Sequence, residues 1–304
     1  MHRTEGADAS PRFTPASYPP RSWISPARRI PRDLWIAWSI TAAAFLPIFG
    51  PWIGDWRADP NYSQGFIIPI ICVFLAARAL RQEAADGTVR GAAIQRFSGV
   101  GIALVLLGLM AYLLGTGGSE SFTTRMGFVL TWLGAVWWIA GGGLGRLLTV
   151  PTLFLLFSVP LPSVIYFSIA VPLQTIAARV ASGVLHGVGV PLTRDGNSLL
   201  LPGMTLEVAD ACSGIRSLTV LLALGALWAY LERGKPVRRA LLFAATVPLA
   251  VLGNAIRVTL SALGVYLVGP WVAEGIAHEA TGLVVFAVTL TGLYLLSKGL
   301  RTSE

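Results

Sequence analysis

The chain has 304 residues, of which 54% are hydrophobic and only 12% are charged, and its formal net charge is +8. Soluble domains carry about 25% charged residues, so the composition excludes a disordered chain, a coiled coil and an ordinary water-soluble enzyme. It predicts an all-α polytopic membrane protein. The positive charge does not indicate nucleic-acid binding, because the basic residues lie in short loops between apolar runs.

The first 33 residues are rich in Pro, Ser and Arg and lack the apolar core of a signal peptide. We expect 1–33 to be a disordered cytoplasmic tail and 34–300 to form one transmembrane domain. Eight apolar runs in that domain predict about eight membrane-spanning helices. They cover about 34–54, 65–80, 97–115, 126–143, 147–160, 211–231, 240–267 and 281–298.

Two segments between the fifth and sixth spans differ from the rest. The segment 163–190 is only moderately apolar, which predicts a helix that lies at the membrane interface or packs against the bundle. Its Arg179 and His186 are interpreted as residues of a polar helix face rather than as catalytic groups. In 191–209, turn residues separate short β-prone runs, which predicts a small hairpin.

The distribution of Lys and Arg predicts the orientation of the chain. With the N-terminus in the cytoplasm, 17 of the 23 basic residues fall in cytoplasmic segments. Such an asymmetry is typical of the positive-inside rule. We therefore expect a protein of the cell inner (cytoplasmic) membrane with both termini in the cytoplasm. The segments 161–210 and 268–280 are then expected on the outer side of that membrane.

This topology places three reactive side chains at a similar depth near the outer face. Cys212 lies at the start of the sixth span, Arg257 in the outer half of the seventh, and His278 just before the eighth. A helix N-terminus stabilises a thiolate. A histidine can act as general base and acid, and an arginine can stabilise an oxyanion.

Several neighbours of these residues are candidate supporting groups. Gly214 allows close approach of a backbone or substrate, and Ser213 is a weaker rival nucleophile. Arg216 lies one turn after Cys212 and shares its helix face, or it pairs with Asp210. The sequence leaves open whether Arg216 or Arg257 is the more important arginine. Asn254 is interpreted first as a hydrogen-bonding bridge between helices.

Other readings start from the same residues. Arg257 could form a structural ion pair with Asp210, Glu207 or Glu279. Cys72 lies inside an apolar run and is interpreted as a small hydrophobic residue. The glycine-rich run 141–145 is interpreted as a helix end rather than a nucleotide loop, and no motif predicts a metal or another cofactor.

Two other function classes remain as alternatives. A transporter usually shows internal repeats and polar groups near the membrane midplane, neither of which is visible here. A non-catalytic scaffold for the assembly of envelope polysaccharide or exopolysaccharide would tolerate Cys212→Ser, whereas an enzyme would not.

The motifs LEVADACSGIRSL (206–218), NAIRV (254–258) and HEATG (278–282) resemble those of the exosortase/archaeosortase family. YSQGFIIPII (62–71) is similar to the early motif of that family, in which a His often replaces Gln64. PLPSVIYFSIAVPLQTIAARVA (160–181) and GVPLTRDGNSLLLPG (189–203) resemble its middle region. The resemblance covers about 34–300.

The resemblance implies a membrane cysteine peptidase or transpeptidase with Cys212 as nucleophile and with Arg257 and His278 as its partners. It also implies that the substrates are exported proteins with a PEP-CTERM-like tail, made of a short Pro-Glu-Pro-like motif, one transmembrane helix and a basic cluster. Such a protein acts among membrane lipids, without nucleic acid, and its site faces outward.

Overall fold

The computed structural model describes residues 32–86, 98–208, 214–232, 234–273 and 275–302. The predicted boundary between a tail 1–33 and a domain 34–300 stays a prediction. The chain is mainly helical, with one small sheet. Its elements are α1 (Arg32–Ala44), α2 (Leu46–Ala58), η1 (Pro60–Phe66), α3 (Ile68–Asp86), α4 (Gly99–Gly117), α5 (Ser121–Leu153), η3 (Phe154–Ser158), α6 (Ser163–Gly187), β1 (Thr193–Asp195), β2 (Ser198–Leu201), β3 (Met204–Glu207), α8 (Gly214–Leu231), α9 (Pro236–Val268), η4 (Pro270–Ala273) and α10 (Gly275–Thr302).

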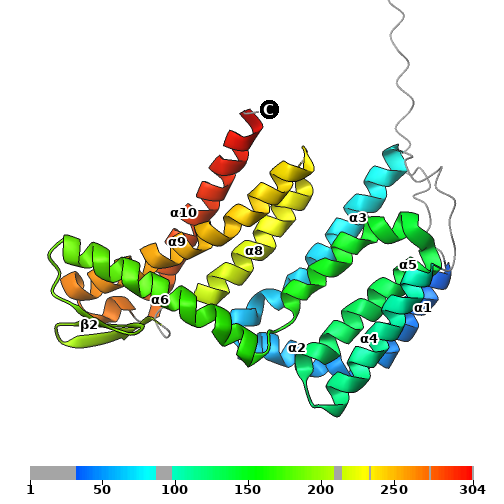
Figure 1. Ribbon diagram of the computed structural model, residues 1–304, viewed down its shortest axis with the longest axis horizontal. Helices are drawn as coiled ribbons and strands as arrows, with labels where there is room; N and C mark the ends of the chain where they lie inside the picture. The colour runs from blue at the N-terminus through cyan, green and yellow to red at the C-terminus, as the bar shows by residue number, and fades with distance from the viewer. Residues whose placement is uncertain (1–31, 87–97, 209–213, 233, 274, 303–304) are drawn as a thin grey trace, which may run out of the picture.

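The helices form two groups that lie beside one another (Figure 1). One group contains α1 to α5, and the other contains α8, α9 and α10, while α6 crosses α8 and α9. The two groups meet where Ile68 and Leu75 of α3 pack with Ala223 of α8 and Phe154 of η3. We call the end that holds the sheet and α6 the sheet end, and the end that holds the α8–α9 turn and the C-terminus the basic end.

The all-α polytopic membrane fold is confirmed. Among the described residues, six helices are long and apolar enough to cross a membrane, or seven if α1 and α2, bent by 69° about Phe45, form one span. The predicted number of eight is not confirmed. The count of six or seven takes α5 as one helix, although it is broken at Gly141, where the prediction divided it into two spans. The count also leaves out α8, which is shorter, and includes α6, which was not predicted as a span.

The fold of α5 follows from one glycine. Gly141 takes φ 71° and ψ −178°, a backbone conformation that is essentially restricted to glycine. Trp137 Nε1 donates to Thr149 Oγ1 at 2.9 Å, although residues twelve apart in a straight helix are separated by about 18 Å. The two arms of α5 therefore fold back on one another (Figure 1). This break confirms that the glycine-rich run 141–145 ends a helix.

The segment predicted as a single hairpin has three antiparallel strands in the order β1-β2-β3. The correction comes from Pro202 and Gly203, which separate β2 from β3 by a two-residue turn with φ +82° at the glycine. Leu199 and Leu206 of the sheet pack on Ala177 of α6 and Ala262 of α9 in one buried cluster. The sheet thus holds α6 against the last third of α9.

A buried carboxylate aligns the last three helices at the basic end. Glu232 follows α8, is 2% exposed at its side chain, and forms ion pairs of 2.7 Å with both Arg238 of α9 and Arg301 of α10. The Ser297 hydroxyl of α10 also donates to it at 3.3 Å. The hydrogen bond from Arg301 and the charge of Arg238 hold the pKa of Glu232 below its ordinary value.

Candidate functional site

The candidate site lies where α9 and α10 meet, near the sheet end. Arg257 lies about 20 residues along α9 beyond Arg238 of the Glu232 cluster, and His278 lies about 20 residues back along α10 from Ser297 of that cluster. A helix rises about 30 Å over that length, which is the thickness of the hydrocarbon core. Both side chains therefore lie about one membrane thickness from the basic end along their helices. Their predicted position near the outer face of the membrane stays a prediction.

Arg257 and His278 are in direct contact. Arg257 Nη2 lies 2.7 Å from His278 Nε2, which joins the two helices through a hydrogen bond. Because a guanidinium only donates, Nε2 accepts, and a neutral imidazole then carries its proton on Nδ1. Within the described residues, no carboxylate pairs with Arg257. Glu279 is within electrostatic range of the imidazole but is exposed to solvent.

Gly282 gives the guanidinium its space. It lies one turn after His278 on α10, and a Cβ added to it would lie 3.1 Å from Cζ and Nη2 of Arg257. That separation is tighter than ordinary van der Waals contact, so a larger residue would displace the arginine. The close approach explains why a glycine follows the histidine by four positions in HEATG.

Asn254 lies one turn before Arg257 and is 6% exposed. Neither its Nδ2 nor its Oδ1 has a hydrogen-bond partner in the described part of the chain. The predicted bridge from Asn254 to another helix is therefore absent among these residues. Arg257 Nε and His278 Nδ1 are also buried without a partner there, so the described residues use only part of the hydrogen-bonding capacity of this region.

The remaining predicted residues precede or begin α8. Asp210, Cys212 and Ser213 lie outside the described residues, and Gly214 begins the helix. Arg216 is exposed, and its charge acts on both His278 and Tyr166 of α6. Arg257 rather than Arg216 makes the hydrogen bond to the histidine. The proposed pairing of Arg216 with Asp210 stays a prediction.

The residues dismissed on α6 have the expected surroundings. Arg179 and His186 are both exposed. His186 Nδ1 lies 2.9 Å from the carbonyl oxygen of Ser182, one turn earlier on the same helix. Their exposure fits the interpretation that they belong to a polar face of α6.

The early motif is connected to α8, a contact that sequence reasoning did not predict. Gln64 of η1 donates from Nε2 to Thr219 Oγ1 at 3.3 Å, and the Thr219 hydroxyl donates to the carbonyl of Arg216 at 3.1 Å. Tyr62 OH accepts from the backbone N–H of Leu161 at 3.2 Å, which fixes η1 against the segment after η3. In the sequence, the resemblance of YSQGF (62–66) to the early motif of the family was the one indication that this segment belongs near the site.

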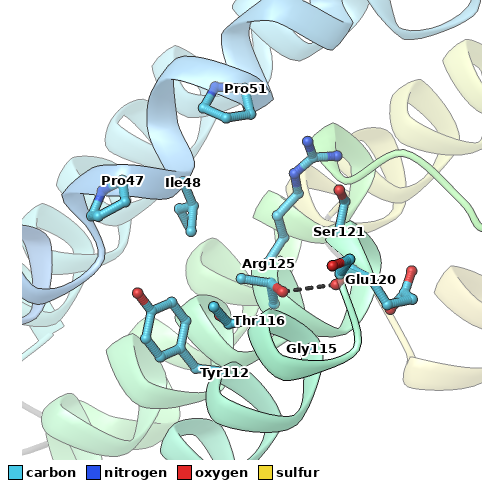
Figure 2. Close-up of a pocket in the computed structure, with 11 residues that line it drawn as sticks. Pro47, Ile48, Pro51, Tyr112, Gly115, Thr116, Glu120, Ser121 and Arg125 are labelled. Carbon is cyan, nitrogen blue, oxygen red and sulfur yellow. Dashed lines mark hydrogen bonds between the residues drawn. The ribbon is translucent and has the colours of Figure 1, made fainter.

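A separate cavity of about 270 Å³ lies between α2, α4 and the start of α5 (Figure 2). Its wall includes Pro51, Tyr112 and Glu120, and it contains none of the predicted site residues. Glu120 caps α5 by accepting from the N–H groups of Phe122 and Thr123. Burial acts to raise the pKa of Glu120, but these hydrogen bonds hold it below its ordinary value.

Comparison with known proteins identifies the family. A family model described as transmembrane exosortase (Exosortase_EpsH) matches residues 56–295. The chain belongs to the transmembrane exosortase family. No curated protein and no solved structure matches it. The matched region of this exosortase includes Gln64, Asn254, Arg257 and His278, so the contacts described above lie within the family's own segment.

Family membership makes the chain a multi-pass membrane protein of a protein-sorting enzyme family. Exosortases are in general cysteine transpeptidases.

Proposed function

We propose that this exosortase is a membrane-embedded cysteine peptidase or transpeptidase that processes the C-terminal sorting signals of exported proteins. The observation that carries the proposal is the 2.7 Å contact between Arg257 and His278. Two basic side chains in contact near the membrane border are costly unless they serve a function. Cys212 lies two residues before Gly214, the start of α8, and supplies the nucleophile.

The reaction uses the three side chains in sequence. Arg257 Nη2 releases His278 Nε2, which takes the proton of the Cys212 thiol, while the guanidinium donates a hydrogen bond to the carbonyl oxygen of the substrate. The thiolate forms a C–S bond to the carbonyl carbon, and the carbonyl π electrons move to the oxygen, where the guanidinium stabilises the negative charge. Collapse of this tetrahedral intermediate breaks the C–N bond, and His278 returns its proton to the leaving amine.

The acyl-enzyme is resolved by a second nucleophile. Water releases a free carboxylic acid, whereas an amine or hydroxyl acceptor gives a transpeptidation or transesterification product. No cofactor is needed for either step. The start of α8 and the α9–α10 contact both lie toward the sheet end of the chain, so the substrate motif is presented there.

The proposed substrates carry a Pro-Glu-Pro-like motif, a transmembrane helix and a basic cluster. With both termini of the enzyme in the cytoplasm, the basic end and the substrate's basic cluster lie on the same side of the inner membrane. The substrate's transmembrane helix then places its Pro-Glu-Pro-like motif about 30 Å from its basic cluster. Arg257 and His278 lie at a similar distance from the basic end of the enzyme. This match of lengths supports a site that faces the outside.

The test is processing of a tagged reporter with such a tail, co-expressed with wild type, Cys212→Ala or Cys72→Ala, and followed by its size on a gel. Cys72 lies on α3 among apolar neighbours and provides the matched cysteine control. We expect wild type and Cys72→Ala to shorten the reporter and Cys212→Ala to leave it full length. Equal shortening by wild type and Cys212→Ala would contradict the proposal, and a panel of tails left intact by wild type would favour a non-catalytic scaffold.

A further inference from the structure

The side chain of Asn254 is buried without using its hydrogen-bonding groups. It is 6% exposed, and its amide offers two N–H donors and one acceptor that no described residue engages. Leaving a buried polar group unpaired costs about 1–3 kcal/mol, and most buried groups are paired for that reason. An alanine at this position would avoid the cost, so the amide is available to a partner that lies beyond the described residues.

The packing of α8 against α9 shows which part of α8 lies beside the Asn254 side chain. Ala250 of α9 packs with Leu218 and Leu221 of α8 in one buried cluster. The two helices run in opposite directions, and Gly225 of α8 lies against Thr246 of α9. Asn254, eight residues after Thr246, is then level with the residue eight before Gly225, in the first turn of α8. Asn254 is therefore level with the start of α8, the segment that directly follows Cys212 in the sequence.

A second unused donor lies on the same face of α9. Arg257 follows Asn254 by three residues, so the two side chains are neighbours on the helix surface. Arg257 Nη2 is engaged by His278, whereas its Nε–H is buried and lacks a partner among the described residues. Both N–H groups are buried and without a partner among the described residues. Because they lie within one turn of α9, both can be presented to one oxygen atom of a ligand.

We propose that Asn254 is a catalytic residue that binds the scissile peptide group together with Arg257. The proposal rests on the proposed function. The carbonyl oxygen accepts from Asn254 Nδ2–H and Arg257 Nε–H, and Asn254 Oδ1 accepts an N–H of the substrate backbone. As the C–S bond forms and the carbonyl π electrons move to the oxygen, both donors stabilise the developing charge. When the tetrahedral centre collapses, the electrons return and the C–N bond breaks.

The first test compares rates of reporter processing in isolated membranes. Removal of one oxyanion donor lowers kcat by about 100-fold, and we expect this loss for Asn254→Ala and Asn254→Asp. Ser261→Ala is the matched control, because Ser261 lies on α9, is 1% exposed, and also has an unpartnered hydroxyl among the described residues. It should process within about twofold of wild type. A wild-type rate for Asn254→Ala overturns the proposal.

The second test separates this proposal from the proposed function. A peptide aldehyde based on the reporter motif forms a thiohemiacetal with a nucleophilic cysteine, and its oxygen mimics the oxyanion. We expect it to protect Cys212 of wild type and Ser261→Ala from alkylation by iodoacetamide, and to protect Asn254→Ala at least tenfold less. Equal protection in all variants overturns the role of Asn254 but leaves the nucleophile in place. Absence of protection in wild type contradicts both.

Discussion

Arg257 of α9 and His278 of α10 are joined by a 2.7 Å hydrogen bond from Nη2 to Nε2. A purely structural arginine in a membrane protein usually pairs with a carboxylate, as Arg238 does with Glu232. The imidazole instead leaves the positive charge of Arg257 uncompensated within the described chain. That charge is available to an oxygen that becomes negative during the reaction, which is the central feature of our account.

The contact depends on the absence of a side chain at Gly282. We predict that Gly282→Ala lowers the rate of reporter processing by about tenfold, because the guanidinium must shift by a few tenths of an ångström to make room for the added methyl group. Gly292→Ala on the same helix is the control, since its Cβ would meet Leu249 at an ordinary 3.7 Å. The two rates are compared at equal amounts of folded protein. Equal rates for the two variants would show that the position of Arg257 does not limit the reaction.

Gln64 is predicted to position the start of α8. Loss of its hydrogen bond to Thr219 removes about 1 kcal/mol, so Gln64→Ala should lower the processing rate about fivefold. The neighbouring Ser63→Ala removes an exposed hydroxyl that donates to the carbonyl of Pro60 within the same turn, and it should leave the rate unchanged. A loss of rate in Ser63→Ala equal to that in Gln64→Ala would instead indicate a general effect of disturbing η1.

The buried Glu232 is predicted to stabilise the fold in a pH-dependent manner. Its pKa is lowered from about 4.5 in the folded chain, so its contribution is complete above that value and is lost as the pH falls through the lowered folded value. At pH 7, Glu232→Gln should lower the Tm in detergent by about 5 °C or more. The exposed Asp195→Asn should not change it.

The difference in Tm between wild type and Glu232→Gln should stay constant from pH 7 to pH 5 and shrink below about pH 4.5. The difference in Tm shrinks at low pH because protonated Glu232 is uncharged, as the glutamine is at every pH. A difference that grows as the pH falls would contradict the assignment of Glu232 as an ionised partner of Arg238 and Arg301.

Gly141 is predicted to be required for the fold-back of α5. An alanine at φ 71° and ψ −178° is strained by about 1–3 kcal/mol, which should lower the Tm by several degrees. Gly142→Ala is the matched control, because the nearest atom to its Cβ is Arg146 Nη2 at 4.0 Å and its φ is ordinary. A Gly141→Ala variant as stable as Gly142→Ala would show that α5 does not need this conformation.

Much of the fold was predictable because apolar runs and loop charges obey simple physical limits. Run length predicted the helices, and the topology placed Arg257 and His278 at one depth before any contact was known. The third strand was missed even though its turn residues, Pro202 and Gly203, are visible in the sequence. The break at Gly141 was predicted as a helix end, but not the return of the chain that makes Trp137 meet Thr149.

Other parts of the site carried no signal in local sequence. Gln64 and Thr219 are 155 residues apart, and hydropathy does not predict which distant helix an amide will meet. The role of Asn254 also required the structure. Its sequence neighbourhood suggested a bridge between helices, and only its burial together with its lack of a described partner argues for a bound ligand.

The most direct test is the rate at which iodoacetamide alkylates Cys212 at pH 7. In a Cys72→Ala background Cys212 is the only thiol, because the chain has two cysteines. If Cys212, Arg257 and His278 form one site, His278→Ala and Arg257→Ala should each slow alkylation by about tenfold, whereas His186→Ala on the exposed face of α6 should not. Identical rates in all four proteins would contradict the account, because the thiol would then react independently of the pair proposed to activate it.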